Sequence, residues 1–171
     1  YFSVATRVDY DLSERQKLFG HFIISRRVQP GKNAFYPGAS GQTLTLKNKA
    51  GVLDYVNTLN NTTVLDARYS LTRFTTLTSL DAKTDAVDLG LPPNVLAGSN
   101  PMAHGFPQVK ITGLGTLGNS DPAFEADNIH DGQISVTKSL NRHQLKFGVE
   151  YRLYQANQAN FTQEHLSIST S

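Results

Sequence analysis

Residues 145–153 read Leu-Lys-Phe-Gly-Val-Glu-Tyr-Arg-Leu, and this stretch decides the class of the fold. Every odd position is apolar and every even position is polar or glycine. Alternation with a period of two residues predicts a β-strand with one apolar and one polar face. A helix would spread the same apolar residues around its whole circumference. The stretch therefore predicts a strand, and the question becomes what its apolar face contacts.

The same alternation returns in three predicted antiparallel hairpins, at about residues 2–25, 50–74 and 128–155. A short polar connection joins the strands of each hairpin, as expected for tight turns. Residues 50–59 are ambiguous, because their apolar positions also fit a short amphipathic helix. We favour a strand, because a polar turn and a clearly alternating strand follow. The chain is therefore predicted to be all-β, with about six strands.

Two long segments separate the hairpins, at about residues 26–49 and 75–127. Both lose the alternation and contain several proline and glycine residues, which predicts loops. A brief strand is expected within the second segment, at Val109–Thr112. Loops of this length are unusual inside a compact domain, whereas they are usual on the outer side of membrane barrels.

The composition excludes several classes of protein. Hydrophobic residues make up 39% and charged residues 18% of the 171-residue chain, and the net charge is only +2. This charge gives no case for a nucleic-acid partner. The chain has no cysteine, which excludes disulfides and thiolate metal sites. Its longest unbroken apolar run is Phe22–Ile24, too short for a transmembrane helix.

Short turns on one side and long loops on the other are typical of an outer-membrane β-barrel. The strands have the length expected of membrane-crossing strands, about 9–11 residues. The fold expected is therefore a segment of an antiparallel transmembrane β-barrel. The predicted lipid-facing residues are Val4, Val8, Leu18, Phe22, Leu65, Tyr69, Leu71, Leu145, Phe147, Val149, Tyr151 and Leu153. The predicted lumen-facing residues are Arg7, Asp9, Asp66, Arg68, Lys146, Glu150 and Arg152.

Two further predictions concern the side chains of these strands. Four of the lumen-facing residues, Asp66, Arg68, Glu150 and Arg152, are expected to form ion pairs between strands, rather than to bind a substrate or the plug. Aromatic residues near strand ends are expected to form the girdles found at the membrane interfaces. These residues are Tyr1, Phe2, Tyr10, Phe19, Phe74 and Tyr154.

No group of residues has the spacing of a catalytic or metal site. The five histidines are scattered, without the spacing of metal ligands. His130 and Asp131 are adjacent in a strand, so they point to opposite faces. Residues 113–118 match a Gly-x-Gly-x-x-Gly pattern, but no helix follows them, so they are interpreted as loop glycines. We expect no enzymatic activity, no cofactor and no metal, and the sequence assigns no ligand-binding residue.

Several motifs, taken in order, carry a resemblance that spans nearly the whole chain. Residues 143–152, His-Gln-Leu-Lys-Phe-Gly-Val-Glu-Tyr-Arg, resemble the His-x-Leu-Lys-Phe-Gly hairpin of the Oar-like TonB-dependent receptors. Residues 68–74 are similar to the Arg-Tyr-x-x-x-Arg-Phe strand of that family. Residues 7–10 and 17–20 resemble its opening hairpin, and residues 89–92, 105–108 and 113–118 resemble its loops.

The resemblance implies a barrel in the bacterial outer membrane that takes up a ligand with energy supplied through TonB. The implied partners are outer-membrane lipid, the rest of the barrel with its plug, and the TonB complex. No plug domain, TonB-binding box or terminal aromatic strand is visible in the sequence. Six strands cannot close a barrel of this type, which uses about 22. We therefore expect a segment from the interior of a longer chain.

Two other classes remain open at this point. A soluble β-sandwich that serves in binding or adhesion would show the same alternation, with its apolar face buried against a second sheet. That alternative predicts strands of about five to six residues and shorter loops. A hydrolase would need a convergent catalytic set, and the sequence offers none.

Overall fold

The computed structural model describes residues 1–31, 41–82, 84–113, 115–118, 121–162 and 165–168. The chain divides into two compact units. The first holds most of the long strands, in residues 1–26, 47–74 and 126–156. The second holds residues 27–46, 75–125 and 157–171. Among the described residues, no helix has the length and apolar character needed to cross a membrane.

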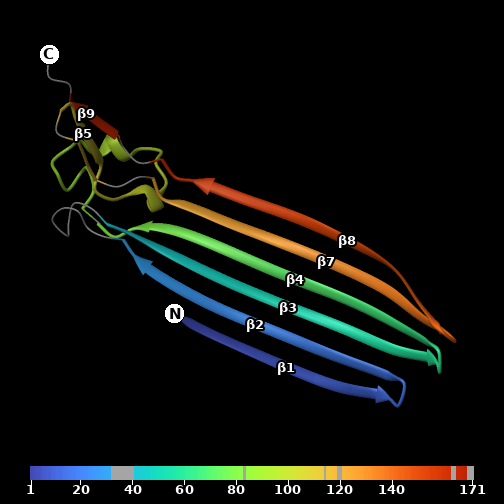
Figure 1. Cartoon of the computed structure of the whole chain (residues 1–171). Coiled ribbons are helices and arrows are strands. Elements are labelled where there is room, and N and C mark those ends of the chain that lie inside the picture. Colours follow the sequence, from blue (N-terminus) through green and yellow to red (C-terminus); the bar gives the residue numbers. More distant parts are fainter. Residues whose placement is uncertain (32–40, 83, 114, 119–120, 163–164, 169–171) are drawn as a thin grey trace. The chain divides into compact units, whose positions relative to one another are not determined.

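The long strands form one six-stranded sheet in the order β1-β2-β3-β4-β7-β8 (Figure 1). The strands are β1 Phe2–Ser13, β2 Gln16–Pro30, β3 Gln42–Asn60, β4 Thr63–Leu80, β7 Ala123–Leu140 and β8 His143–Asn160. They pair as three hairpins, so the predicted all-β antiparallel architecture is confirmed. The sheet is open, with β1 and β8 as its two edges. The ambiguous residues 50–59 lie within β3, which confirms the preference for a strand.

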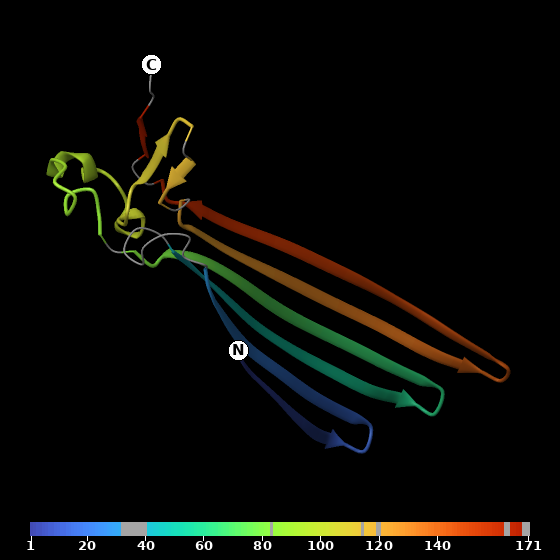
Figure 2. The ribbon, with the colours of Figure 1, turned by 60° about the vertical axis from the view of Figure 1, so that its left-hand side comes forward.

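The three hairpin turns lie at the same end of the sheet (Figure 2). Backbone hydrogen bonds join the hairpins close to these turns: the Thr58 N–H donates to the Arg15 carbonyl, and the Ser139 N–H donates to the Thr62 carbonyl, both at 2.8 Å. In the last turn Asn141 has a φ of 44°. Asparagine adopts this left-handed conformation more readily than most residues, which suits it to a tight turn.

The pairing of β1 with β2 fixes which residues share a face. Phe2 lies opposite Arg26, Val8 opposite Gly20, and Tyr10 opposite Leu18. Opposed residues in an antiparallel pair point to the same side of the sheet. The even-numbered residues of both strands therefore share one face.

The predicted loop boundaries were wrong, because the strands run further than the alternation suggested. The segment predicted as a loop at about 26–49 contains strand as far as Pro30 and again from Gln42. The segment at about 75–127 contains strand as far as Leu80 and again from Ala123. In residues 42–46 the leucines fall at even positions, whereas in residues 52–56 apolar residues fall at both even positions (Val52, Val56) and odd ones (Leu53, Tyr55). The apolar residues therefore do not keep to one face along β3, which breaks the alternation although the backbone stays extended.

The second unit contains a small sheet of its own. Its elements are the 3₁₀ helices η1 Pro93–Leu96 and η2 Pro101–Ala103 and the strands β5 Gln108–Ile111, β6 Gly115–Leu117 and β9 His165–Ile168. The strand order is β6-β5-β9; β6 pairs antiparallel and β9 parallel to β5. The brief strand expected at Val109–Thr112 corresponds to β5. The rest of the long segment is more structured than predicted.

Large apolar side chains are mostly exposed, and the fully buried apolar ones are small. Among the described residues, the buried hydrophobic side chains are those of Ala82, Ala86, Ala103 and Ala126. The sheet exposes many large ones, among them Phe147 at 66% and Tyr151 at 70%. A soluble sandwich would bury such a face against a second sheet. The structure thus favours an apolar face that is covered by something other than this chain's long strands.

Candidate functional site

One face of the long sheet, here called the apolar face, carries the even-numbered residues of β1, β2 and β7 and the odd-numbered residues of β3, β4 and β8. A Cβ on Gly51 of β3 would lie 3.9 Å from the Phe22 ring of β2. The Tyr69 hydroxyl of β4 lies 2.8 Å from the His130 Nδ1 of β7. These short distances show that Gly51 and Phe22, and likewise Tyr69 and His130, lie on the same side of the sheet in neighbouring strands.

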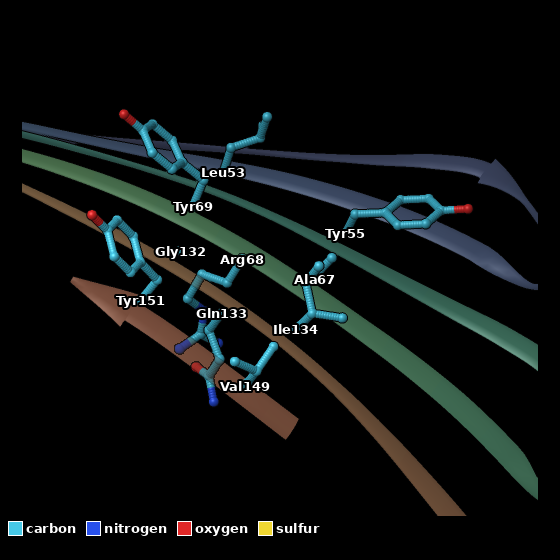
Figure 3. A pocket seen from close by; sticks show the side chains of 10 residues that line it. All are labelled: Leu53, Tyr55, Ala67, Arg68, Tyr69, Gly132, Gln133, Ile134, Val149 and Tyr151. Carbon is cyan, nitrogen blue, oxygen red and sulfur yellow. The ribbon is translucent and has the colours of Figure 1, made fainter. Parts of the chain in front are cut away.

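A shallow depression of about 420 Å³ follows the same face from β3 to β8. Leu53, Tyr69, Ile134 and Tyr151 line it, one from each of the strands β3, β4, β7 and β8 (Figure 3). A second depression is lined by residues of β1 to β4, among them Val8, Phe22 and Leu71. Both depressions are open to the outside. The apolar face is therefore a broad surface, and neither depression forms an enclosed cavity.

All the predicted lipid-facing residues occupy positions of this apolar face. Most of them are exposed, with values such as 63% for Val8 and 67% for Val149. Leu18 and Leu65 are partly covered. Contiguous exposed apolar surface on this scale marks contact with a partner or a membrane.

All the predicted lumen-facing residues occupy positions of the opposite face, here called the polar face. The Arg68 Nε donates a 2.6 Å hydrogen bond to the Asp54 carboxylate. The Arg152 guanidinium donates to Asp131 and to Glu150, each at 2.6 Å. The prediction of ion pairs between strands is confirmed for Arg68, which joins β4 to β3, and for Arg152, which joins β8 to β7. It was wrong for Glu150, which pairs with Arg152 of its own strand, and Asp66 forms no ion pair among the described residues.

Sequence reasoning missed two of the partners, Asp54 and Asp131. Both occupy positions of the polar face, so strand alternation places them correctly once the face of each strand is known. Only the strand order shows which arginine each one meets. Asp54 is 1% exposed, and its Oδ1 has no hydrogen-bond partner among the described residues. The hydrogen bond from Arg68 is therefore the main interaction that offsets the free-energy cost of burying the Asp54 carboxylate.

The predicted aromatic girdle was only partly right. Phe19 lies opposite Asp9 on the polar face, and the Arg7 guanidinium lies 4.6 Å from its ring centroid. Phe74 and Tyr154 also occupy polar-face positions, and the Tyr154 hydroxyl is 3.4 Å from the Arg152 Nη1. A cation over a ring face is a favourable contact, so Phe19 stabilises the Arg7 guanidinium, whereas Tyr154 accepts a long hydrogen bond from Arg152 through its hydroxyl. Phe2 and Tyr10 do lie on the apolar face.

The prediction that the side chains of His130 and Asp131 point to opposite faces of the sheet is confirmed. The His130 ring contacts Tyr69 on the apolar face, whereas Asp131 pairs with Arg152 on the polar face. The described residues contain no cluster of three or more histidine and carboxylate side chains close enough to hold a metal ion. Gly115 begins the short strand β6 and Gly118 has a φ of 93°. This glycine pattern therefore belongs to a hairpin and its exit, not to the helix start that binds dinucleotides.

A family model described as an outer membrane beta barrel domain matches residues 2–170. A search of curated proteins finds no match. The matched range includes all six long strands, so both the apolar and the polar face fall within it.

Proposed function

Since this chain belongs to the outer membrane beta barrel domain family, we propose that it forms part of the barrel of a TonB-dependent receptor. Such a receptor takes up a ligand across the bacterial outer membrane with energy supplied through TonB. The location in the outer membrane follows from the family. Uptake of a ligand through TonB is what the proposal adds to this location.

The dimensions of the apolar face suit contact with lipid. Phe2 and Tyr10, both on this face, are eight residues apart on β1. At about 3.4 Å per residue they are separated by roughly 27 Å along the strand. A tilt of about 35–45° reduces the distance between their Cα atoms to roughly 19–22 Å across the membrane, which fits within the apolar band of about 25 Å in known barrels. We therefore propose that the predicted lipid-facing residues contact lipid.

The observation that carries the proposal is the set of paired charges on the polar face. The pairs Asp54–Arg68 and Asp131–Arg152 each join two neighbouring strands. A narrow barrel fills its interior with packed side chains, whereas a wide barrel encloses water or a plug. A charged, internally paired face suits the second case. The paired arginines and carboxylates give a folded plug a polar surface in which these particular charges already have partners.

The open edges of the sheet support a larger barrel. Unpaired backbone groups at β1 and β8 would be costly in lipid, where no water can satisfy them. Closure therefore requires further strands beside both edges. TonB-dependent receptors provide such strands, and the motifs at residues 68–74 and 143–152 resemble that family. The proposed partners are outer-membrane lipid, the remaining barrel and plug, and the TonB complex, and the proposal includes no catalytic step.

The test uses the full-length protein in native cells. A photo-crosslinking amino acid in the periplasmic domain of TonB should yield an adduct with the full-length protein. The adduct should disappear when the inner-membrane proton gradient is collapsed. An outer-membrane protein that never crosslinks to TonB would refute receptor activity while leaving the barrel intact.

A second measurement separates a plugged receptor from a passive pore. In planar lipid bilayers, a plugged barrel should show little steady conductance until urea loosens the plug. Stable open channels without urea would indicate a porin instead. Neither measurement requires a ligand.

A further inference from the structure

Four cations lie at one end of the apolar face, and we call them the cationic rim. They are Arg26 of β2, Lys47 and Lys49 of β3, and Arg73 of β4. Arg26 is on the apolar face because it lies opposite Phe2. Lys47 and Lys49 share the odd positions of Gly51 and Leu53, and Arg73 shares those of Tyr69 and Leu71. All four side chains are exposed.

The cationic rim lies at the end of the sheet away from the three hairpin turns. On β2 the apolar face runs from Leu18 through Ile24 and then meets Arg26. On β4 it runs from Leu65 through Leu71 and then meets Arg73. In outer-membrane barrels the short turns face the periplasm and the long connections face outward. The cationic rim is thus at the external border of the lipid-facing surface.

No carboxylate on the apolar face of the first unit neutralises these cations. The carboxylates of its strands all occupy polar-face positions: Asp9, Asp11, Asp54, Asp66, Asp127, Asp131 and Glu150. Among the described residues, Arg26, Lys47 and Lys49 form no ion pair, and Arg73 donates only to the Asn128 amide oxygen, at 3.2 Å. On the polar face, by contrast, Arg7, Arg68 and Arg152 are all paired with carboxylates. Because the carboxylates lie on the polar face and the cationic rim lies on the apolar face, the rim can bind an anion that does not belong to this chain.

The surface beside these cations is shaped for an amphiphile. A depression of about 430 Å³ is lined by Phe2 and Ile24 on its apolar side and by Arg26, Lys47 and Lys49 on its cationic side. An acyl chain suits the apolar side, and an anionic headgroup suits the lysines and arginine. A free inorganic anion would use the charges but not Phe2 or Ile24.

We propose that the cationic rim binds the phosphate groups of a phosphorylated lipid in the external leaflet, with an acyl chain of that lipid against Phe2 and Ile24. Lysine and arginine at membrane borders also extend toward water without binding a particular lipid. The proposal differs from this in requiring phosphate on the headgroup. It rests on membership in the barrel family and not on TonB-dependent uptake, so a failure of the receptor proposal would leave it standing.

The first experiment needs no variant. The full-length protein, purified in a non-ionic detergent, is titrated with diphosphoryl lipid A, and bound lipid is counted by native mass spectrometry. The same titration is repeated with lipid A from which both phosphates have been removed and which keeps all acyl chains. We expect the loss of phosphate to abolish most of the binding, and the remaining binding to be insensitive to salt. Equal binding of the two lipids would overturn the proposal.

A pair of matched variants then locates the site. Lys47→Gln with Lys49→Gln removes two cations from the apolar face. Lys17→Gln with Lys146→Gln removes two exposed cations from the polar face and changes the net charge equally. At about five-fold per lysine near an anionic lipid surface, the first pair should weaken binding roughly 30-fold. The second pair should leave it within about two-fold, because these lysines are on the other face.

Folding of both variants is checked by the heat-dependent mobility of the barrel on gels. A folded Lys47/Lys49 variant that binds diphosphoryl lipid A like the wild type would refute this location. Equal losses in the two variants would also refute it, because a general effect of net charge would then explain the binding.

Discussion

Val8→Lys provides the most direct test of which face contacts lipid. Val8 lies on β1 opposite Gly20 and is 63% exposed, so the substitution displaces little protein packing. It is six residues after Phe2 and two before Tyr10 on the same face, which places it about two residues from the centre of the apolar band. A lysine near the membrane midplane costs about 2–4 kcal/mol in barrel stability. We expect a loss of this size.

Ala5→Lys is the matched control on the same strand. Ala5 is exposed, lies three residues from Val8 and occupies the polar face opposite Ile23. A surface substitution without special contacts changes stability by about 0.5 kcal/mol or less. Stability is measured for the full-length protein by urea titration in lipid vesicles, with folded and unfolded bands separated on gels. Equal costs at the two positions, or a larger cost for Ala5→Lys, would refute the assignment of the faces.

Three further predictions concern single contacts and use the same stability assay. Arg68→Met should lower the free energy of unfolding by about 2–3 kcal/mol, because it leaves the buried Asp54 carboxylate unpaired. Adding Asp54→Leu should recover part of this loss, and no recovery would contradict the ion pair. Gly148→Ala should cost about 1–3 kcal/mol, because its Cβ would lie 2.9 Å from a backbone oxygen of β7, whereas Gly132→Ala meets nothing within 4 Å and should cost far less. Asn141→Ala should cost about 1–2 kcal/mol at its φ of 44° and Asn141→Gly much less; a tolerated alanine would argue against the left-handed turn.

Much of the sheet was predictable from the sequence because a membrane demands strict alternation. In Leu145–Leu153 every second residue is apolar, and the structure places these residues on one exposed face. The short polar connections were equally informative, since a two-residue turn leaves the chain little choice but to reverse. Arg68 and Arg152 were expected to pair between strands, and they do.

The prediction failed where the membrane stops imposing that alternation. Beyond the apolar band, the leucines of residues 42–46 change to the other face, so the pattern no longer indicated the strand that is there. Phe19 was expected at the membrane border because of its position near a strand end. Its contact with Arg7 on the polar face depends on the pairing of β1 with β2, which strand ends alone do not specify.

The sequence by itself determined the strand class, the three hairpins and the two faces, because these depend on neighbours within a few residues. Only the tertiary structure decided which strands lie side by side, and with them the partners of Asp54 and Asp131. It also joined β9 to β5, more than fifty residues away, in parallel. The cationic rim has the same origin: Arg26, Lys47, Lys49 and Arg73 come together because three adjacent strands end their apolar runs at the same border. Local pattern sets the face of a residue, but strand order and register set its neighbours.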